Sequence, residues 1–310
     1  MKNKTKNKRR IFRRGDGPLY IMAAPTVVLL AMFAYAPMAG LVLAFKNYNI
    51  HKGIFGSDWC GFKNLEFLFA STDTAIMIRN TILFNIVFLA LNTILAVCLS
   101  LILGEIYSKK MKKVYQTIYM LPHFLSWAII AIVLNAFLNP HNGYITNIVE
   151  NMGYDGVFNA YGIIEIWPPL LVGLNAWKGV GYSAVMYLAV ISGISTDYYE
   201  AAVLDGASRF QQAWYITIPH LRTIISITLI MSIGSIFRGD FGLFYVVTQN
   251  SGQLYPVTTV IDTYVFRALT TMSNVGMPAA VGLLQSVVGF IFVLLANKVV
   301  SKIDPDSAMF

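Results

Sequence analysis

Charged side chains are scarce in this chain. Only 12% of its 310 residues are Asp, Glu, Lys or Arg, whereas 56% are hydrophobic. A soluble domain carries roughly 25% charged residues, so water is not the main solvent of this protein. The composition therefore argues against an ordinary soluble enzyme and indicates a protein that is embedded in lipid.

Reactive cysteines and catalytic motifs are scarce as well. The two cysteines, Cys60 and Cys98, have no spacing typical of a metal site or a disulfide framework. The four histidines are scattered without an H-E-x-x-H motif, and the phosphate-binding motif G-x-x-x-x-G-K-[ST] is missing. The segment 181–185 lacks the last glycine of a nucleophile elbow. We therefore expect no enzymatic activity, no bound metal or cofactor, and no ATP hydrolysis by this chain.

Long apolar runs are what the sequence has instead. A helix needs about 20 apolar residues to cross the hydrocarbon core of a bilayer. The first run follows a basic segment but is too long for a signal peptide, so we expect a retained anchor. We predict an all-α integral membrane protein with six transmembrane helices, at Leu19–Phe45, Thr81–Leu103, Thr117–Leu138, Pro169–Ile191, Thr223–Phe237 and Ala279–Val300.

The net charge of +8 is unevenly distributed, which argues against nucleic acid as a partner. Basic residues gather at 2–14 and 109–113, whereas residues 139–168 contain no Lys or Arg. By the positive-inside rule, both termini are expected in the cytoplasm. We predict a basic arm at residues 1–16 that lies near anionic lipids, a six-span domain at 17–303, and a short cytoplasmic tail at 304–310.

The polar segment 195–220, between the fourth and fifth apolar runs, predicts two short helices. Asp197 can cap the first helix, with Glu200 three residues later in a capping-box arrangement. Gly206 suits the left-handed residue that ends such a helix. The same charge pattern places this segment in the cytoplasm.

The second of these helices is expected to begin at Ser208 and to be bounded by Pro219. Gln211 follows Ser208 by three residues, and Pro219 bars an unkinked continuation. A compact helix–turn–helix on the cytoplasmic face of a membrane protein indicates a docking element for another protein. The alternative is an amphipathic loop that lies on the bilayer.

The fifth run is short and interrupted. Its 15 residues span about 22 Å of helix, and Arg238-Gly239-Asp240 separates it from a further apolar stretch. Such a broken span lines the substrate site in many transporters. Alternatively, the span ends at Phe237 and Arg238 snorkels to the outer interface. Helical spacing of apolar residues over 260–269 predicts an external helix packed against the bundle.

Lys178 lies near the middle of the fourth run, at a depth where a lysine needs a partner. Asp240, an anionic ligand and internal pairing are the three alternatives. In the third run, Pro122 predicts a kink and Trp127 offers a flat face to a sugar ring. The candidate cavity residues are Trp127, Lys178, Tyr182, Arg238, Asp240 and Tyr245.

These motifs carry a family resemblance. The pattern Glu200-Ala201-Ala202, Asp205-Gly206, Ile216 and Ile218-Pro219 resembles the signature loop of ATP-binding-cassette importer permeases, with Ile218 where the family usually has Leu. The similarity extends over about 19–300. Four further stretches are similar to the carbohydrate (polysaccharide-type) branch, namely 119–124, 177–182, 239–245 and 255–264.

The resemblance implies a subunit that moves a sugar into a bacterial cell, across its membrane, by alternating access. It implies three kinds of protein partner: a second permease, a pair of cytoplasmic ATPases that use ATP and Mg, and an external solute-binding protein. The coupling residues toward the ATPases would be Glu200, Ala201, Ala202, Asp205, Gly206 and Pro219.

Both the transported solute and the class of transporter have alternatives. Arg238 and Lys178 would favour an oligosaccharide that carries uronate, because cations complement carboxylates. The same signature loop also serves importers of other solutes. An ion-driven secondary transporter is a further alternative, although charges at membrane depth are confined to Lys178 and the segment 238–240.

Overall fold

The computed structural model describes residues 17–70, 74–153, 158–272 and 275–303. The predicted basic arm and the C-terminal tail lie outside these residues. Within the described part, the chain is helical except for one two-stranded antiparallel ladder. The all-helical prediction is therefore confirmed.

Four helices are long and apolar enough to span a membrane, and two bent helix pairs bring the number to as many as six within the described residues. The prediction of six spans agrees with that upper count. The four long helices are Gly17–Phe45 (α1, η1 and η2), Thr74–Gly104 (α4), Arg209–Ile233 (α10, η5 and α11) and Gly276–Lys302 of α14 (Gly276–Ile303). The bent pairs are α5 (Lys109–Phe124) with α6 (Trp127–Leu138), and η4–α8 (Ile164–Ile166, Trp167–Ile191) with α9 (Thr196–Leu204).

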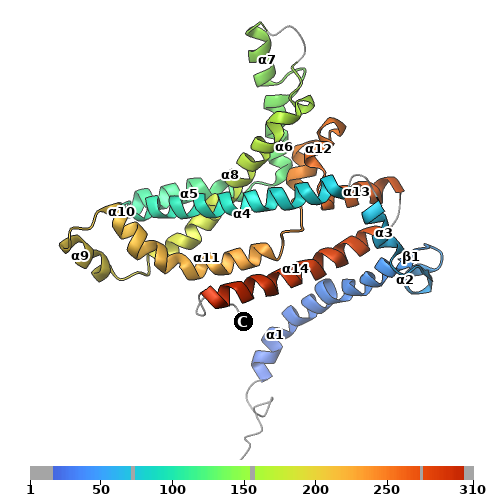
Figure 1. Ribbon diagram of the computed structural model, residues 1–310, viewed down its shortest axis with the longest axis horizontal. Helices are drawn as coiled ribbons and strands as arrows, with labels where there is room; N and C mark the ends of the chain where they lie inside the picture. Colours follow the sequence, from blue (N-terminus) through green and yellow to red (C-terminus); the bar gives the residue numbers. More distant parts are fainter. Residues whose placement is uncertain (1–16, 71–73, 154–157, 273–274, 304–310) are drawn as a thin grey trace, which may run out of the picture.

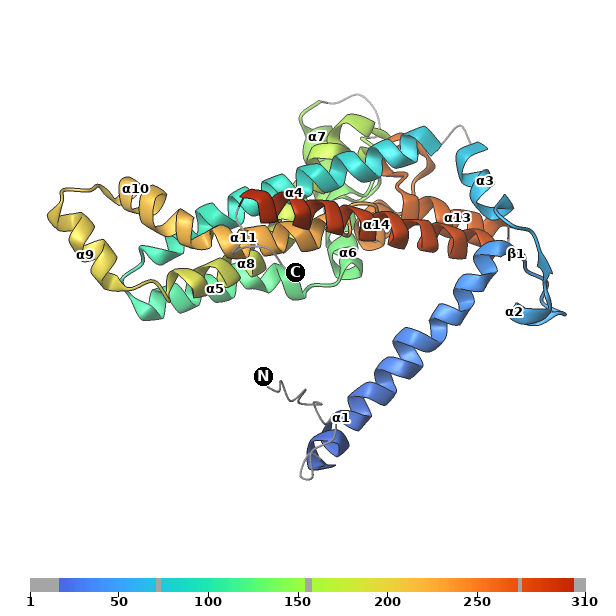
Figure 2. The same ribbon diagram turned by 60° about the horizontal axis from the view of Figure 1, so that its bottom comes forward.

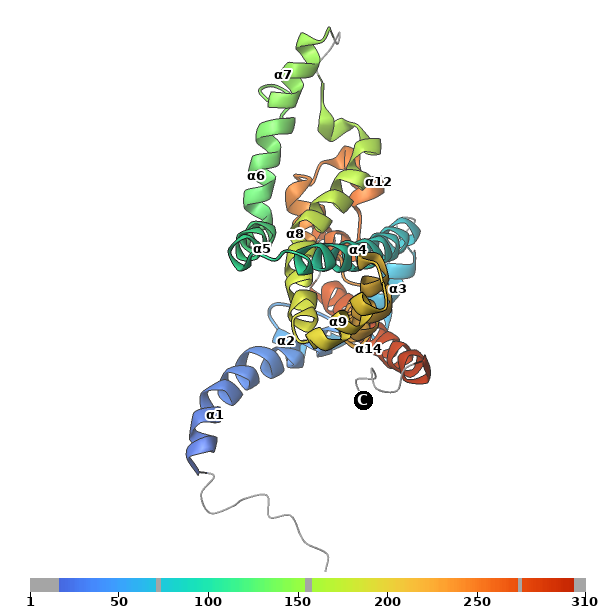
Figure 3. The same ribbon diagram turned by 90° about the vertical axis from the view of Figure 1, so that its left-hand side faces the viewer.

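The long helices α4, α11 and α14 run along a common direction, with α5 beside them (Figure 1). At one end of this bundle lie α9 and α10 (Arg209–Gln212); at the other end lie α3 (Lys63–Ala70) and α13 (Ile261–Met272). Helix α6 and the short α7 (Tyr144–Asn151) project sideways from the bundle (Figure 3). The main apolar core is formed where α4, α6, α8 and the segment after the fifth span meet, around Phe84, Phe88, Trp167 and Phe244.

The first span stands apart from the bundle. Figure 2 shows it diverging from α14 at an angle, and only its last part packs against α14 and α3. Leu43 and Ala44 are buried there, whereas Ile21 and Phe33 are each 74% exposed. An apolar helix of this length is left without a protein neighbour over most of its surface within this chain.

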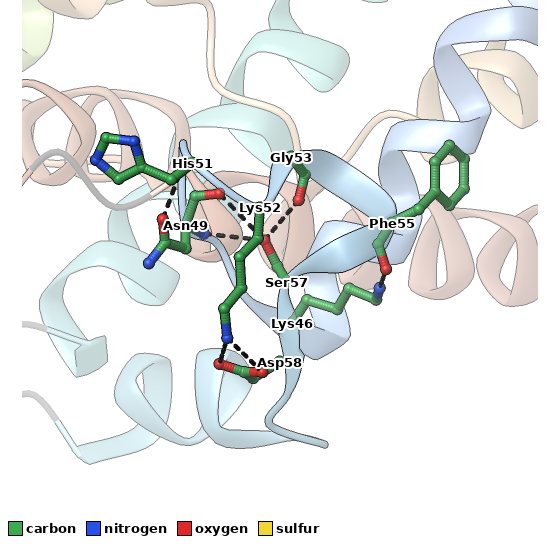
Figure 4. Close-up of polar contacts among 8 residues, drawn as sticks. All are labelled: Lys46, Asn49, His51, Lys52, Gly53, Phe55, Ser57 and Asp58. Atoms are coloured by element: carbon green, nitrogen blue, oxygen red, sulfur yellow. Dashed lines mark hydrogen bonds and ion pairs between the residues drawn. The ribbon is translucent and has the colours of Figure 1, made fainter.

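A small hairpin follows the first span (Figure 4). Strand β1 (Lys46–Asn47) pairs with β2 (Asp58–Trp59), and α2 (Gly53–Gly56) lies between them. The Ser57 Oγ accepts the backbone N–H of Asn49 at 2.9 Å and donates to the Gly53 carbonyl at 2.6 Å. Lys52 and Asp58 form an ion pair of 2.8 Å. Helix α3 follows this hairpin and precedes the second span.

The third span differs from its prediction. The sequence predicts one helix kinked at Pro122, but the helix passes through Pro122, ends at Phe124, and turns by 92° into α6. The turn is stabilised by Ser126, whose Oγ accepts the Ile129 N–H at 3.3 Å and so caps α6. Helix α5 also begins earlier than expected, so residues 109–113 form its first turns.

The fifth span also differs. The prediction places a separate short helix before Pro219, yet the helix runs without interruption from Arg209 to Ile233. Pro219 lies in the first turn of α11 (Ile218–Ile233), directly after the π-helical segment η5 (Ala213–Thr217). A change of hydrogen-bond register of this kind accommodates a proline without ending the helix.

The remaining helices are short and connect these elements. The helix predicted over 260–269 is confirmed as α13, whose Ile261, Tyr264 and Val265 pack against Met77 of α4 and Val281 of α14. The others are η3 (Ala160–Gly162), η6 (Gly242–Val247), η7 (Gly252–Leu254) and α12 (Tyr255–Thr258).

Candidate functional site

The loop after the fourth span begins with α9, on which Glu200 and Ala201 are exposed and Ala202 is half-buried. Its N-cap is Ser195, whose Oγ accepts the Asp197 N–H at 3.3 Å, so the prediction that Asp197 caps this helix is wrong. Ser195 takes this role because its own backbone is extended, as an N-cap requires.

Gly206 ends α9 as predicted. Its φ is +77°, a conformation that L side chains rarely adopt. The N–H of Ala207 donates to the Ala202 carbonyl at 2.8 Å, and the N–H of Gly206 donates to the Val203 carbonyl at 3.1 Å. This pair of bonds is a Schellman motif, which fixes the angle between α9 and the next helix.

The fifth span starts with the predicted capping box. Ser208 Oγ accepts the Gln211 N–H, and the Gln211 side chain accepts the Ser208 N–H at 2.7 Å. The tip of this loop exposes large apolar side chains, since Leu204 is 88% and Phe210 is 75% exposed. A surface of this kind at the end of a helical bundle is suited to contact with another protein.

The same loop is tied to the end of α4. Arg209 forms an ion pair of 3.2 Å with Glu105 and donates to the Tyr107 hydroxyl at 2.6 Å. Both partners lie in the connection from α4 to α5. The loop is therefore linked to two spans besides the one that it begins.

A polar cavity of about 400 Å³ lies inside the bundle, between α4, α8, α11 and the segment after α11. Amide and hydroxyl groups dominate its polar lining, and one cation and one acid accompany them. These residues are Asn85, Asn92, Thr93, Asn175, Ser183, Tyr187, Thr228, Ser232, Ser235, Arg238 and Asp240. Such a lining suits a hydroxyl-rich solute that also carries charge.

The break predicted at Arg238-Gly239-Asp240 borders this cavity. Helix α11 ends at Ile233, and a new helical turn begins after Asp240. The Asp240 carboxylate accepts the Leu243 N–H at 3.2 Å, which caps that turn. The structure agrees with the first of the two alternatives, a broken span that lines a cavity, and not with a span that simply ends at the outer interface.

Trp127 supports the break from the side. Its Nε1–H donates to the Asp240 carboxylate at 2.8 Å, so α6 is bonded to the fifth span. A side chain at Gly242 would have no room there, because a Cβ would lie 2.1 Å from Trp127 Cδ1. Trp127 and Asp240 are thus brought together, and the indole is partly buried against that segment.

Lys178 does not pair with Asp240. Its Nζ donates to the carbonyl oxygens of His123 and Leu125, at 2.8 and 2.6 Å, and lies 5.3 Å from the Trp127 ring centroid. These carbonyls belong to the end of α5, where helical partners are lacking. Internal pairing, the third alternative for this lysine, therefore describes its contacts in the structure.

The two candidate tyrosines lie apart from the cavity lining. Tyr182 stacks on the His123 ring with centroids 4.6 Å apart. Tyr245 stacks on Phe241 at 4.7 Å and packs edge-on against Phe266 at 5.0 Å. Arg238 and Asp240 are thus the members of the predicted set that line the cavity.

Sequence reasoning missed three polar residues that contact the break. Asn85, Asp262 and Gln285 each bond a backbone group of residues 237–239. Burial raises the pKa of the Asp262 carboxyl, and hydrogen bonds from Gly239 and Gln285 lower it in part. The available signal was a set of polar residues inside or beside apolar runs, and the helical pattern had placed Asp262 outside the packed stripe.

Apolar helices around a polar cavity define a membrane-embedded transport protein. Residues 94–304 match the family model of the binding-protein-dependent transport system inner membrane component. The chain belongs to this family.

Relatives and solved structures are similar over nearly the whole length. The chain is 32% identical over 92% of its length to the polygalacturonan/rhamnogalacturonan transport system permease protein YteP of Bacillus subtilis (strain 168), and it covers 88% of that protein. It resembles a chain of a bacterial transporter that imports the acidic polysaccharide alginate, with a TM-score of 0.81 and 32% identity, over 93% and 96% of the two chains. A second structure of the alginate transporter, with an alginate pentasaccharide-bound periplasmic protein, gives 0.80 and 32% over 93% and 95%.

Proposed function

We propose that this chain is the permease subunit of an ATP-driven importer for oligosaccharides that carry uronate groups. The cavity between α4, α8 and α11 is the part of the path that this subunit supplies. Arg238 is the group that contacts the sugar carboxylate, and the amides and hydroxyls around it contact the sugar hydroxyls.

The observation that carries the proposal is the state of Arg238. Its guanidinium makes no hydrogen bond or ion pair with any described residue, although it lines the cavity and is exposed. A guanidinium offers a planar set of donors that matches a carboxylate. Asp240, which stands two residues away, instead accepts hydrogen bonds from Trp127 and Leu243.

The lining amides fit the remaining part of such a cargo. Among the described buried side-chain polar atoms, Asn92 Oδ1 is the one without a hydrogen-bond partner, while its Nδ2 donates to Asn175 at 2.8 Å. A buried acceptor of this kind is expected to find a donor, and a sugar hydroxyl supplies one. The names of YteP and of the alginate transporter, which refer to acidic polysaccharides, support the same substrate class.

The loop 195–220 is proposed as the contact with a cytoplasmic ATPase. Glu200, Ala201, Ala202 and Asp205 lie on or next to α9, Gly206 ends that helix, and Pro219 lies in the first turn of α11. With the loop on the cytoplasmic side, both termini also lie in the cytoplasm of a bacterial cell in this proposal. ATP and Mg are used by the ATPases, and this chain supplies only the coupling surface.

Gly206→Pro tests that role. Proline requires φ near −65°, whereas Gly206 has +77°, so the Schellman turn is lost while the spans are unaffected. We expect normal membrane insertion and a severalfold loss of sugar-stimulated ATPase activity in the assembled transporter. Gly252→Ala, at a glycine with open space and an ordinary φ, is the control. Unchanged stimulation in Gly206→Pro would contradict the coupling role.

A second permease and an external binding protein complete the proposed assembly. The first span leaves most of its apolar surface without a neighbour in this chain (Figure 2), which suits packing against a second permease. The alginate transporter was solved with a periplasmic protein bound to its sugar, which supports the same kind of partner here.

Affinity purification of the tagged chain from its own membrane tests the assembly. Mass spectrometry should identify a second permease and an ATPase among the proteins recovered. Recovery of the chain alone, active in ion-driven uptake, would overturn the importer assignment and favour a secondary transporter.

A further inference from the structure

We propose that Asp262 and Gln285 are positioning residues that set where Arg238 stands in the cavity. The inference deepens the proposed function and rests on it as far as the cargo is concerned. Neither side chain contacts the sugar in this account. They act through the backbone of the break in the fifth span.

At the break, one backbone group of each of three consecutive residues is held by a side chain from another element. Gln285 Nε2 of α14 donates to the Phe237 carbonyl at 2.7 Å. Asn85 Nδ2 of α4 donates to the Arg238 carbonyl at 3.0 Å, and the Gly239 N–H donates to the Asp262 carboxylate of α13. Where a helix ends inside a membrane protein, freed backbone groups need partners of this kind.

Asp262 and Gln285 form one unit. Gln285 Nε2, besides its bond to the Phe237 carbonyl, lies 3.3 Å from Asp262 Oδ2. Gln285 holds the carbonyl of the residue before Arg238, and Asp262 holds the N–H of the residue after it. The two bonds together therefore fix the direction of the backbone through Arg238. The pair comes from α13 and α14, which lie more than 20 residues further along the chain.

Helix α13 also has packing contacts outside the break. Its Ile261 is buried against Met77 and Val281, so the helix is packed between α4 and α14. The same junction leaves no space at Gly239, where a Cβ would lie 2.5 Å from Val260 Cγ2. The break is therefore packed against the start of α13, and a loss of the Asp262 bond removes one of the constraints on the backbone that carries Arg238.

The charge of Asp262 also helps to position Arg238. It attracts the Arg238 guanidinium at a distance, without an ion pair between them within the described structure. An acid that attracts the cation through space leaves all of its N–H donors available to a ligand. This arrangement differs from a closed salt bridge, in which the carboxylate of the protein would compete with the carboxylate of the sugar.

Thiol labelling measures the position of residue 238 without reference to cargo. In a Cys60→Ser, Cys98→Ser background, Arg238→Cys is labelled with a charged thiol reagent in the assembled transporter. We expect Asp262→Ala or Gln285→Met to change the labelling rate severalfold, and Asp262→Asn to change it less, because Asn keeps an oxygen that accepts the Gly239 N–H. Glu66→Ala, which removes an exposed acid on α3, is the control. Rates equal to the parent in both Asp262→Ala and Gln285→Met would overturn the inference.

Transport then links position to specificity. The ratio of uptake of an acidic galacturonate trisaccharide to its neutral methyl ester is measured for Asp262→Ala, Arg238→Gln and the double variant. We expect Asp262→Ala to lower the ratio severalfold, and to have no further effect once Arg238 is Gln. A ratio lowered by Asp262→Ala equally in both backgrounds would contradict action through Arg238. A ratio unaffected by Arg238→Gln would refute the cargo proposal, while the labelling result would still decide the positioning role.

Discussion

The third span and the fifth span are both interrupted, and the freed backbone groups are held in opposite ways at the two breaks. At the third span, the carbonyls exposed at the end of α5 are held by the cation of Lys178. At the fifth span, the freed groups are held by Asn85, Asp262 and Gln285, and the cation of Arg238 is left to the cavity. A charged side chain at membrane depth therefore has a structural role where it bonds the freed backbone groups itself. Where other side chains bond those groups, the charge is available to a ligand.

The largest loss of stability is expected from Lys178→Met, which tests the structural role of the cation at the third span. Two carbonyls lose a charged donor, and hydrogen bonds to charged groups each contribute about 1.5–3 kcal/mol. We expect a loss of at least about 2 kcal/mol in the stability of the assembled transporter, measured by thermal unfolding in detergent. Arg238→Met is the matched control, since no described backbone group depends on its guanidinium. Equal losses for the two variants would remove the distinction.

Trp127→Phe tests the bond that joins the two breaks. The substitution keeps an aromatic ring but removes the N–H that donates to Asp240 at 2.8 Å. We expect a loss of about 1.5–3 kcal/mol, the range for one hydrogen bond to a charged acceptor. Trp214→Phe, at an exposed position on the π-helical segment, is the control. If Trp127→Phe unfolds at the parent temperature, the bond to Asp240 does not hold the break.

Gly242→Ala tests the close approach of the same two segments. Its Cβ would clash with the Trp127 ring, and overpacking of this kind costs about 1–3 kcal/mol. The unfolding temperature should fall, whereas Gly252→Ala should leave it unchanged. A neutral result at Gly242 would mean that α6 and the fifth span are free to separate.

The smallest effect is a pH dependence at Asp262. Its pKa is raised by burial above the ordinary value of 3.8, so the folded state binds more protons than the unfolded state between 3.8 and the folded pKa. Its contribution to stability is therefore present below 3.8 and is lost as the pH rises through that window. Asp262→Asn should flatten this part of the profile of unfolding temperature against pH, and the exposed Glu66→Gln should not. A profile unaltered by Asp262→Asn would contradict the burial of this acid.

The apolar spans and the turn at Gly206 could be predicted from the sequence because both depend on local rules, although six is the upper limit of the four to six spans within the described residues. Apolar length and glycine conformation need no knowledge of distant residues. The right angle after Phe124 could not be predicted, because it depends on Ser126 as a cap and on Lys178, more than 50 residues later, as a donor. The prediction that a separate helix is bounded by Pro219 was wrong for another reason. The π-helical segment before this proline has no simple sequence signal.

The candidate cavity was predicted in part. The charged break pointed to Arg238 and Asp240, which line the cavity, because charge inside an apolar run is visible in one dimension. Tyr182 and Tyr245 were chosen by residue type alone, and their stacking on His123 and Phe241 depends on helix packing. Asp262 was placed outside the packed stripe of its helix, since periodicity cannot reveal that Gly239 lies opposite.

The most direct test compares Lys178→Gln with Arg238→Gln in the transporter assembled with its partner subunits. Uptake of a galacturonate trisaccharide and of its neutral methyl ester is measured for each. The account predicts that Arg238→Gln abolishes the preference for the acidic sugar, while Lys178→Gln lowers uptake of both sugars and leaves their ratio unchanged. A ratio altered by Lys178→Gln and not by Arg238→Gln would contradict it.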